Sequence, residues 1–271
     1  MSSILPRGSS GRTARRIAVQ AAREAGRIVR RQFGVAQTVG HKGRGNIVTE
    51  TDLLSEQTIL GLLRQEFPEH GILSEESPAV ASTSPYVWVV DPLDGTLNFA
   101  SQLQHFAVAI ALVADGAPVL GVVYDPLRRE LFVAERGRGA TLDGRPLRVG
   151  DREDLGTAIG GFDLGYDEEG RGQALAAAVA LRPAIQSLRV MGSAVLGQAY
   201  VACGRFDLYF HRFLFPWDVA AAQVLLREAG ALATAWDGRP ATIHSRALIA
   251  ANPDLHRAFL EVVAAGSALP G

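Results

Sequence analysis

One segment organises this chain: Trp88-Val89-Val90-Asp91-Pro92-Leu93-Asp94-Gly95-Thr96-Leu97-Asn98. Residues 86–90 are apolar or aromatic at every position, which is typical of a strand buried on both faces. Two carboxylates, Asp91 and Asp94, follow where this run stops. Pro92 favours an extended conformation for Asp91, and Gly95 permits a sharp turn. The segment therefore predicts two acidic side chains that point into one space at the carboxyl end of a buried strand.

The residue types in this segment favour metal and phosphate binding. Carboxylates and an upturned backbone carbonyl are oxygen donors of the kind that magnesium takes. The amides of Gly95 and Thr96 could open a helix whose N-terminus receives an anion. The alternative interpretation is an ordinary Asp-Pro turn followed by a Thr cap.

Composition fits a globular protein. The chain has 271 residues, with 48% hydrophobic and 20% charged, as in one large domain or two closely packed halves. No apolar run approaches the roughly 18 to 20 residues of a membrane span, and residues 1–30 contain no apolar segment of the kind found in a secretory signal. We therefore expect a cytoplasmic protein without a membrane partner. Cys203 is the only cysteine, which excludes an internal disulfide and a multi-cysteine zinc site.

Charge is unevenly distributed along the chain. The net charge is −1, but residues 1–50 carry +8 and the remainder −9. The basic residues are arginines except Lys42, the only lysine. An arginine-rich N-terminus can be a solvated helix face or a nucleic-acid patch. We favour the solvated face and expect no nucleic-acid partner.

The hydrophobic pattern predicts two halves that differ in the order of their helices and strands. We expect disorder over residues 1–11, an N-terminal α+β half over 12–150, and a C-terminal α/β half over 151–271. In the first half the pattern predicts a glycine-rich loop at 40–46, helices at 13–33 and 49–68, a hairpin at Asp143-Gly144, and antiparallel strands at 106–113, 117–124 and 130–134. In the second half it predicts strands at 187–190, 206–210, 231–235 and 247–251, with helices at 173–181, 192–202, 217–228 and from Pro253.

Two further acidic sites stand at element boundaries. Glu75 and Glu76 follow the short apolar run after Gly71, and because adjacent side chains of an extended chain diverge, we expect only Glu75 to face a shared site. Asp218 lies in the first turn of an apolar helix after Pro216, where the alternative role is stabilising the helix dipole. Converging carboxylates would repel one another unless cations bind.

Three segments together resemble the inositol monophosphatase family: Gly71-Ile72-Leu73-Ser74-Glu75-Glu76, Trp88 to Phe99, and Pro216-Trp217-Asp218-Val219-Ala220-Ala221. The resemblance covers nearly the whole chain. It implies an αβαβα sandwich, a homodimer, and magnesium-dependent, lithium-sensitive hydrolysis of small phosphate monoesters.

The resemblance also implies roles for single residues. One magnesium ion is implied at Glu75, Asp91 and the Leu93 carbonyl, a second at Asp91, Asp94 and Asp218, and a third, weaker one at Glu75. We therefore expect two or three Mg²⁺ ions per site.

The resemblance also implies which residues bind the phosphate and which activate the attacking water. The amides of Gly95 and Thr96 would hold phosphate, with Lys42 nearby, although a chance surface lysine is the alternative. Asp52 with Thr96 would orient or deprotonate the attacking water, in an in-line displacement that needs no covalent intermediate. No Ser, Cys and His arrangement indicates a nucleophile triad.

The substrate side departs from the family pattern. His211 stands where members acting on inositol phosphates have an acid, and Arg212 follows it. Either Arg212 meets a second anionic group of the substrate, or it is solvated and His211 binds a hydroxyl. Asp163 and Ser193 are implied at the pocket border.

Several activities stay open on this basis. We expect hydrolysis of an inositol-1-phosphate-like ester or a related sugar or alcohol phosphate. The alternatives are activity on fructose 1,6-bisphosphate, histidinol phosphate or a nucleotide bisphosphate, or, from another class, a regulatory protein that binds RNA or a transcription complex.

Overall fold

The N-terminal segment is packed rather than disordered where the structure shows it. The computed structural model describes residues 5–43 and 46–265. Residues 1–4 of the expected disordered segment lie outside this range. Within it, Leu5 is only 6% exposed, and Ser10 Oγ donates to Glu66 Oε2 at 2.7 Å. The expectation of disorder was therefore wrong for residues 5–11, because a buried acid distant in sequence holds this polar segment.

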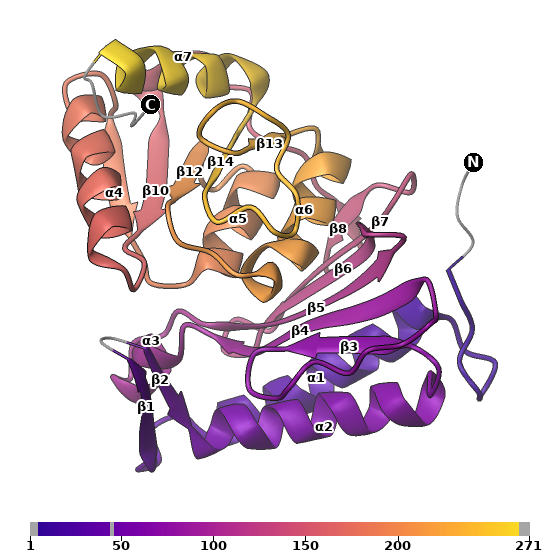
Figure 1. The fold of residues 1–271 in the computed structure, drawn as a ribbon. Coiled ribbons are helices and arrows are strands. Elements are labelled where there is room, and N and C mark those ends of the chain that lie inside the picture. Colours follow the sequence, from indigo (N-terminus) through magenta and orange to yellow (C-terminus); the bar gives the residue numbers. More distant parts are fainter. Residues whose placement is uncertain (1–4, 44–45, 266–271) are drawn as a thin grey trace.

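The N-terminal half is a seven-stranded sheet covered on one face by two helices (Figure 1). These are α1, Ala14–Gln32, and α2, Glu50–Glu66. The strand order is β3-β4-β5-β6-β7-β8-β9; β3 and β4 are parallel, and the other pairs are antiparallel. The strands span Gly71–Ser74 (β3), Tyr86–Asp94 (β4), Ala107–Ala114 (β5), Ala117–Asp125 (β6), Glu130–Glu135 (β7), Ala140–Leu142 (β8) and Arg145–Pro146 (β9). The predicted meander is confirmed.

Small residues let α1 pack closely on the sheet. Thr13 begins the helix, and its side chain accepts from the Arg16 amide at 3.4 Å. The buried stripe comprises Ala14, Ile17, Ala18, Ala21, Ala22, Ala25 and Val29. Gly26 lies so close to the Tyr124 ring that an added Cβ would approach it to 2.5 Å. The arginines occupy the remaining faces of the helix, as the spacing predicted.

The described residues of the segment expected to be a glycine-rich loop lie in two paired strands. β1, Val39–Gly43, pairs antiparallel with β2, Asn46–Thr49. Every residue of β1 is exposed, so no hydrophobic alternation marked this strand. Residues 44–45 of the expected loop lie outside the described residues.

The C-terminal half holds a five-stranded mixed sheet of order β11-β10-β12-β14-β13. Its strands are β10 (Ile159–Asp163), β11 (Ser187–Val190), β12 (Leu208–His211), β13 (Leu232–Thr234) and β14 (Leu248–Ala251). Its helices are α4 (Glu168–Leu181), α5 (Ala194–Ala202), α6 (Pro216–Ala229) and α7 (Pro253–Ala265). The sequence did not predict β10, because two glycines at its centre weaken the strand signal.

The layers follow the order αβαβα, which confirms the predicted architecture (Figure 1). Helices α5 and α6 lie between the two sheets and share one hydrophobic core with both. α4 and α7 cover the outer face of the five-stranded sheet. At Gly121 of β6 an added Cβ would lie 2.2 Å from the Ala221 carbonyl, so this glycine permits the close contact between α6 and the sheet.

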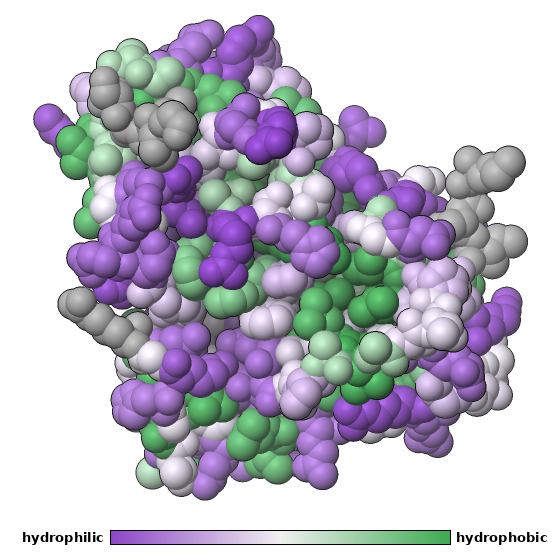
Figure 2. Space-filling view, in the orientation of Figure 1, coloured by the Kyte–Doolittle hydropathy of each residue, from purple (hydrophilic) through white to green (hydrophobic). Residues whose placement is uncertain are grey.

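The chain passes between the halves after β9, which ends at Pro146, and before the short 3-10 helix Leu155–Thr157. Figure 2 shows that hydrophobic surface on this face of the molecule gathers over the seven-stranded sheet, whereas hydrophilic residues cover much of the rest. Among the described residues, no helix combines the length and apolarity that a membrane crossing requires.

Candidate active site

Three carboxylates meet where the two halves of the chain face each other. Asp91 and Asp94 lie at the end of β4, where a register shift interrupts its pairing with β5, and Asp218 lies in the first turn of α6. One oxygen from each of the three lies within 4.8 Å of the others. Asp91 is 1% exposed and Asp94 is 7% exposed. The structure thus brings together three of the four predicted carboxylate ligands.

Backbone amides fix one side of each carboxylate. Asp91 Oδ1 accepts from the Leu93 amide at 3.0 Å, and Asp218 Oδ2 accepts from the Phe215 amide at 2.6 Å. Within the described residues, no hydrogen bond reaches Asp91 Oδ2 or Asp218 Oδ1. These oxygens keep their lone pairs for another partner.

Asp94 is held by the other half of the chain. Its carboxylate accepts from the amides of Ala194 at 3.2 Å and Val195 at 3.0 Å, in the first turn of α5. The Ser193 hydroxyl also donates to Asp94. Ser193, predicted at the substrate border, therefore positions a carboxylate and caps α5 instead of lining the pocket.

The acids raise one another's pKa values. Burial, followed by the charges of Glu75, Asp94 and Asp218, raises the pKa of Asp91. Burial raises the pKa of Asp94 to about 7, and burial with the charge of Glu75 raises that of Asp218. Ionising these three carboxylates together is costly unless a cation is bound. Their donor atoms are all oxygens, which suits magnesium. The residues present therefore fit a divalent metal ion.

Glu75 and Glu76 share a cation. Lys42 Nζ, on the exposed hairpin strand β1, lies 2.7 Å from Glu75 Oε1 and 2.8 Å from Glu76 Oε1. Both acids reach Lys42 because the chain bends after β3 instead of staying extended. The charge of Glu75 also raises the pKa values of Asp91 and Asp218, and the expectation that Glu75 rather than Glu76 faces the shared site stays a prediction. Burial raises the pKa of Glu76 to about 7 despite this ion pair. Lys42 thus has two acidic partners, and its predicted place near the phosphate stays a prediction.

Glu56 of α2 holds this acidic segment, and sequence reasoning missed it. Its carboxylate accepts from the hydroxyls of Ser74 and Ser77, and from the Glu76 amide at 3.2 Å. Glu56 is 6% exposed and lies on the buried face of α2 with Ile59. Its helical spacing with the buried Ile59, Leu60 and Leu63 was the signal that could have found it.

Asp52 and Thr96 form the predicted pair. Thr96 Oγ1 lies 2.8 Å from Asp52 Oδ1 and 2.9 Å from the Leu93 carbonyl. The other carboxylate oxygen of Asp52 accepts from the Thr49 amide at 2.8 Å. Burial raises the pKa of Asp52, so this carboxyl binds a proton more readily than an exposed aspartate.

The turn before Thr96 requires glycine. Gly95 has φ +89°, and an added Cβ would lie 3.0 Å from the His105 carbonyl and 3.1 Å from that of Gly192. The amides of Gly95 and Thr96 donate no hydrogen bond within the described residues. Binding of a phosphate by these two amides stays a prediction.

A small pocket of about 130 Å³ adjoins the carboxylates. Both halves of the chain supply its walls: Asp94, Gly95, Thr96, Leu97, Asn98, Asp163, Leu164, Gly165, Tyr166, Gly192, Ala194, His211, Phe213 and Asp218. Sequence reasoning missed Tyr166 and Phe213. Tyr166 lines this pocket together with Asp94 and Asp218, and burial followed by the charges of the neighbouring acids raises its pKa.

His211 and Asp163 face this pocket but are fixed by the protein. His211 Nδ1 accepts from the Phe213 amide at 2.9 Å, and burial lowers the pKa of the ring to about 4. Asp163 accepts from the Gly192 amide at 2.6 Å and from the Tyr209 hydroxyl at 2.9 Å. Asp163 therefore shapes the wall through the loop before α5.

Arg212 turns away from the pocket. Its Nε donates to Gln173 Oε1 at 2.6 Å, and its guanidinium lies 4.4 Å from the centre of the Trp236 ring. Arg212 is absent from the pocket walls, so the structure does not support its predicted contact with the substrate. The cation on this side is Arg246, which lies 4.4 Å from the Phe213 ring centre and opposes the effect of burial on the pKa of Asp218.

The αβαβα layers and the buried acids between them define a class of α/β proteins whose carboxylates can bind divalent metal ions. The chain belongs to the inositol monophosphatase family, whose model matches residues 12–267. It is similar to inositol monophosphatase 1 of Solanum lycopersicum, with 37% identity over 91% of this chain and 93% of that protein. It is also similar to Nus factor SuhB of Escherichia coli strain K12, with 39% identity over 90% of this chain and 93% of the relative.

A solved structure agrees with this fold. The inositol monophosphatase of Anabaena (Nostoc) sp. PCC 7120 superposes with a TM-score of 0.83 and 36% identity, covering 93% of this chain and 95% of that one. The family and the fold class predicted from the sequence are confirmed.

Proposed function

We propose that this protein hydrolyses a small phosphate monoester with magnesium bound between its two halves. The observation that carries the proposal is the convergence of Asp91, Asp94 and Asp218 beside the Asp52–Thr96 pair. Membership of the inositol monophosphatase family and the similarity to a named inositol monophosphatase support it.

The chain offers ligands for two or three ions. Asp91 and Asp218 would use the oxygens left without hydrogen bonds, with Asp94, Glu75 and the Leu93 carbonyl completing the sets. Bound magnesium would lower the pKa of a water and neutralise charge on the attacking and leaving oxygens. Asp91, Asp94 and Asp218 each accept from a backbone amide, which supports carboxylates that are held in position before an ion binds.

Asp52 and Thr96 would accept the proton that the attacking water loses. Thr96 Oγ1 already lies within hydrogen-bond distance of Asp52 Oδ1, so the threonine can pass its proton to the carboxylate while accepting one from water. The raised pKa of Asp52 suits this base role. The free amides of Gly95 and Thr96 would orient the phosphate.

The pocket favours a neutral alcohol over a second phosphate. Its described walls carry no lysine or arginine, and Arg212 has turned to Gln173. Because the Phe213 amide can only donate, His211 Nδ1 is the acceptor and the proton of the neutral ring lies on Nε2. His211 would therefore donate to a substrate hydroxyl, which favours an inositol-1-phosphate-like, sugar or alcohol ester.

The test is phosphate release from inositol 1-phosphate, fructose 1,6-bisphosphate, histidinol phosphate and a nucleotide bisphosphate, with magnesium and with a chelator. We expect magnesium-dependent release that favours the single monoesters. Asp91→Asn protein, purified in parallel, controls for contaminating phosphatases. Absence of release from every ester contradicts the activity, and a preference for the bisphosphates contradicts the substrate class.

We also propose a homodimer. Leu175 and Val179 lie one turn apart on the outer helix α4 and are 48% and 69% exposed, and β11 is an edge strand. Mass measurement in solution tests this, and Val179→Glu should shift a dimer to monomer. Lithium inhibition and a cytoplasmic location stay predictions, tested by lithium titration of the release assay and by cell fractionation.

A further inference from the structure

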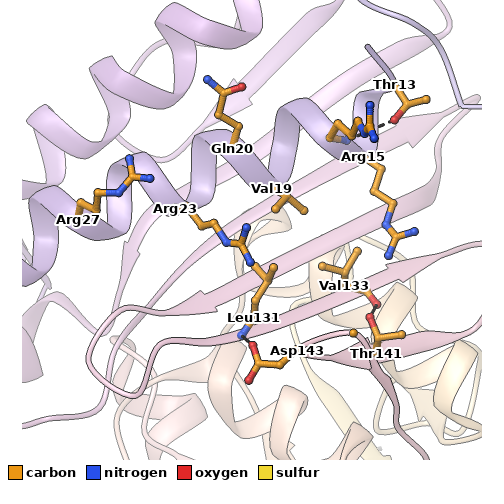
Figure 3. A pocket seen from close by; sticks show the side chains of 12 residues that line it. Thr13, Arg15, Val19, Gln20, Arg23, Arg27, Leu131, Val133, Thr141 and Asp143 are labelled. Atoms are coloured by element: carbon orange, nitrogen blue, oxygen red, sulfur yellow. Dashed lines mark hydrogen bonds between the residues drawn. The ribbon is translucent and has the colours of Figure 1, made fainter.

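A larger groove lies beside α1, separate from the acidic pocket (Figure 3). Its volume is about 760 Å³. One wall is α1 and the other is formed by β7, β8 and the turn after β8. The lining residues are Thr13, Arg15, Arg16, Val19, Gln20, Arg23, Arg27, Leu131, Val133, Thr141, Asp143 and Gly144. None of them lines the pocket beside the three carboxylates.

The groove carries uncompensated positive charge. The side chains of Arg15, Arg16, Arg23 and Arg27 are exposed and have no hydrogen-bond or ion-pair partner within the described residues. The one acid in the lining, Asp143, accepts from the Leu131 amide at 3.0 Å, as Figure 3 shows. By contrast, Arg12 just before the helix is paired with Glu66 at 2.5 Å. The arginines predicted to form a merely solvated face thus border a concave surface.

The floor of the groove is apolar. Leu131 and Val133 of β7 are 7% and 5% exposed, and Val19 of α1 is half-buried beside them. Among residues 5–43 and 46–265, no aromatic side chain lines the groove. Single-stranded nucleic acid is usually held by stacking bases on aromatic rings, so this lining lacks the main feature of such a site. An apolar floor between cations suits a chain that carries both acidic and apolar side chains.

The arginine spacing also suits an extended peptide. At about 1.5 Å per residue, Arg23 and Arg27 are about 6 Å apart along α1, and Arg16 lies about 10 Å from Arg23. Side chains on one face of an extended chain recur about every 6.6 Å. Acids at alternate positions could therefore meet Arg23 and Arg27 together while the residues between them face the floor or the solvent.

We propose that this groove binds an acidic, partly apolar peptide segment of a partner protein. Its carboxylates would pair with Arg16, Arg23 and Arg27, and its apolar side chains would cover Val19, Leu131 and Val133. Arginine is suited to this role because its planar guanidinium pairs with carboxylates in a bidentate manner. The proposal is independent of the hydrolytic activity, since it uses none of the residues at the acidic site.

The test uses full-length protein and a fluorescein-labelled 12-residue peptide in which glutamate alternates with valine or leucine. Binding is followed by fluorescence anisotropy at two salt concentrations. We expect binding that weakens with salt, and Arg16→Gln with Arg23→Gln should weaken it roughly five- to thirtyfold. Val19→Thr, which keeps the side-chain shape, should weaken it by a smaller factor.

Matched controls separate the groove from general charge. Arg30→Gln with Arg31→Gln removes the same charge from the same helix outside the groove and should leave the affinity within about twofold. Phosphate release should be unchanged in both double variants. Equal binding of a peptide with lysine in place of glutamate, equal loss in the control variant, or binding of a 12-nucleotide uridine RNA without binding of the peptide would each overturn the proposal.

Discussion

Asp94 belongs to the N-terminal half, but the Val195 amide of the C-terminal half donates to its carboxylate at 3.0 Å. The first turn of α5 thus holds a candidate metal ligand of the opposite half. Ser193 adds a hydroxyl donor to the same carboxylate. The candidate metal centre can therefore form only when the two halves are packed together.

Ser193→Ala should weaken magnesium binding. The variant removes the hydroxyl donor that orients Asp94, and loss of such a supporting bond lowers metal affinity about 10- to 100-fold. The magnesium dependence of phosphate release should shift to higher concentration, and saturating magnesium should restore much of the rate. Ser187→Ala in β11 is the control, and an unchanged magnesium dependence in Ser193→Ala would count against this positioning role.

Asp91→Asn should abolish turnover while making the metal-free protein more stable. The amide has nearly the same shape as the carboxylate and removes one of several repelling charges. In thermal unfolding we expect a higher midpoint without magnesium and little further increase when magnesium is added, whereas the unmodified protein should gain stability from the ion. Asp237→Asn, at an exposed position, should behave like the unmodified protein. A magnesium-dependent midpoint in Asp91→Asn would argue against this carboxylate as a ligand.

His211 and Arg212 are adjacent but should respond differently to substitution. His211→Ala removes a pocket wall and should raise KM several-fold, with the largest change for polyol esters. Arg212→Ala should cost about 1 kcal/mol of stability through its lost contacts with Gln173 and Trp236, and should leave the substrate ranking unchanged. Steady-state kinetics on the four esters checks both variants. A changed ranking of the four substrates in Arg212→Ala would support the alternative that Arg212 contacts a second anionic group of the substrate.

The buried His105 should make the fold sensitive to acid. Burial lowers its pKa to about 4, and neither ring nitrogen has a hydrogen-bond partner. Between its ordinary pKa of 6.5 and this lowered value the unfolded chain binds more protons, so stability is present at neutral pH and is lost as the pH falls. By pH 4.5 the expected loss from this residue is about 2 to 3 kcal/mol.

His105→Phe isolates this contribution, because the ring of Tyr200 can pack against either side chain. The free energy of unfolding, measured in urea at pH 7.5 and 4.5, should fall less for the variant than for the unmodified protein. Carboxyls with raised pKa values act in the opposite direction, so the difference between the two proteins is the quantity to compare. If the free energy of unfolding falls equally in both proteins between pH 7.5 and 4.5, the contribution assigned to His105 is refuted.

Much of this structure was readable from local sequence. The apolar run of β4, the Pro92 and Gly95 turn, and the helical spacing in α1 each act through the backbone or a single face, so their effects are encoded within a few residues. The pairing of Asp52 with Thr96 came from the resemblance to a known family, whereas the same local signals predicted Asp91 and Asp94. Those predictions needed no knowledge of distant contacts.

Tertiary structure decided which side chains share a partner. Both Glu75 and Glu76 turn to Lys42, Ser193 serves Asp94, and Arg212 turns from the pocket to Gln173. By itself, the sequence determined most of the elements, the acids and the family, because strand and helix periodicity and short motifs are local. Packing alone decided the roles of the polar residues around them, because a hydrogen bond or ion pair depends on groups that become neighbours only after folding.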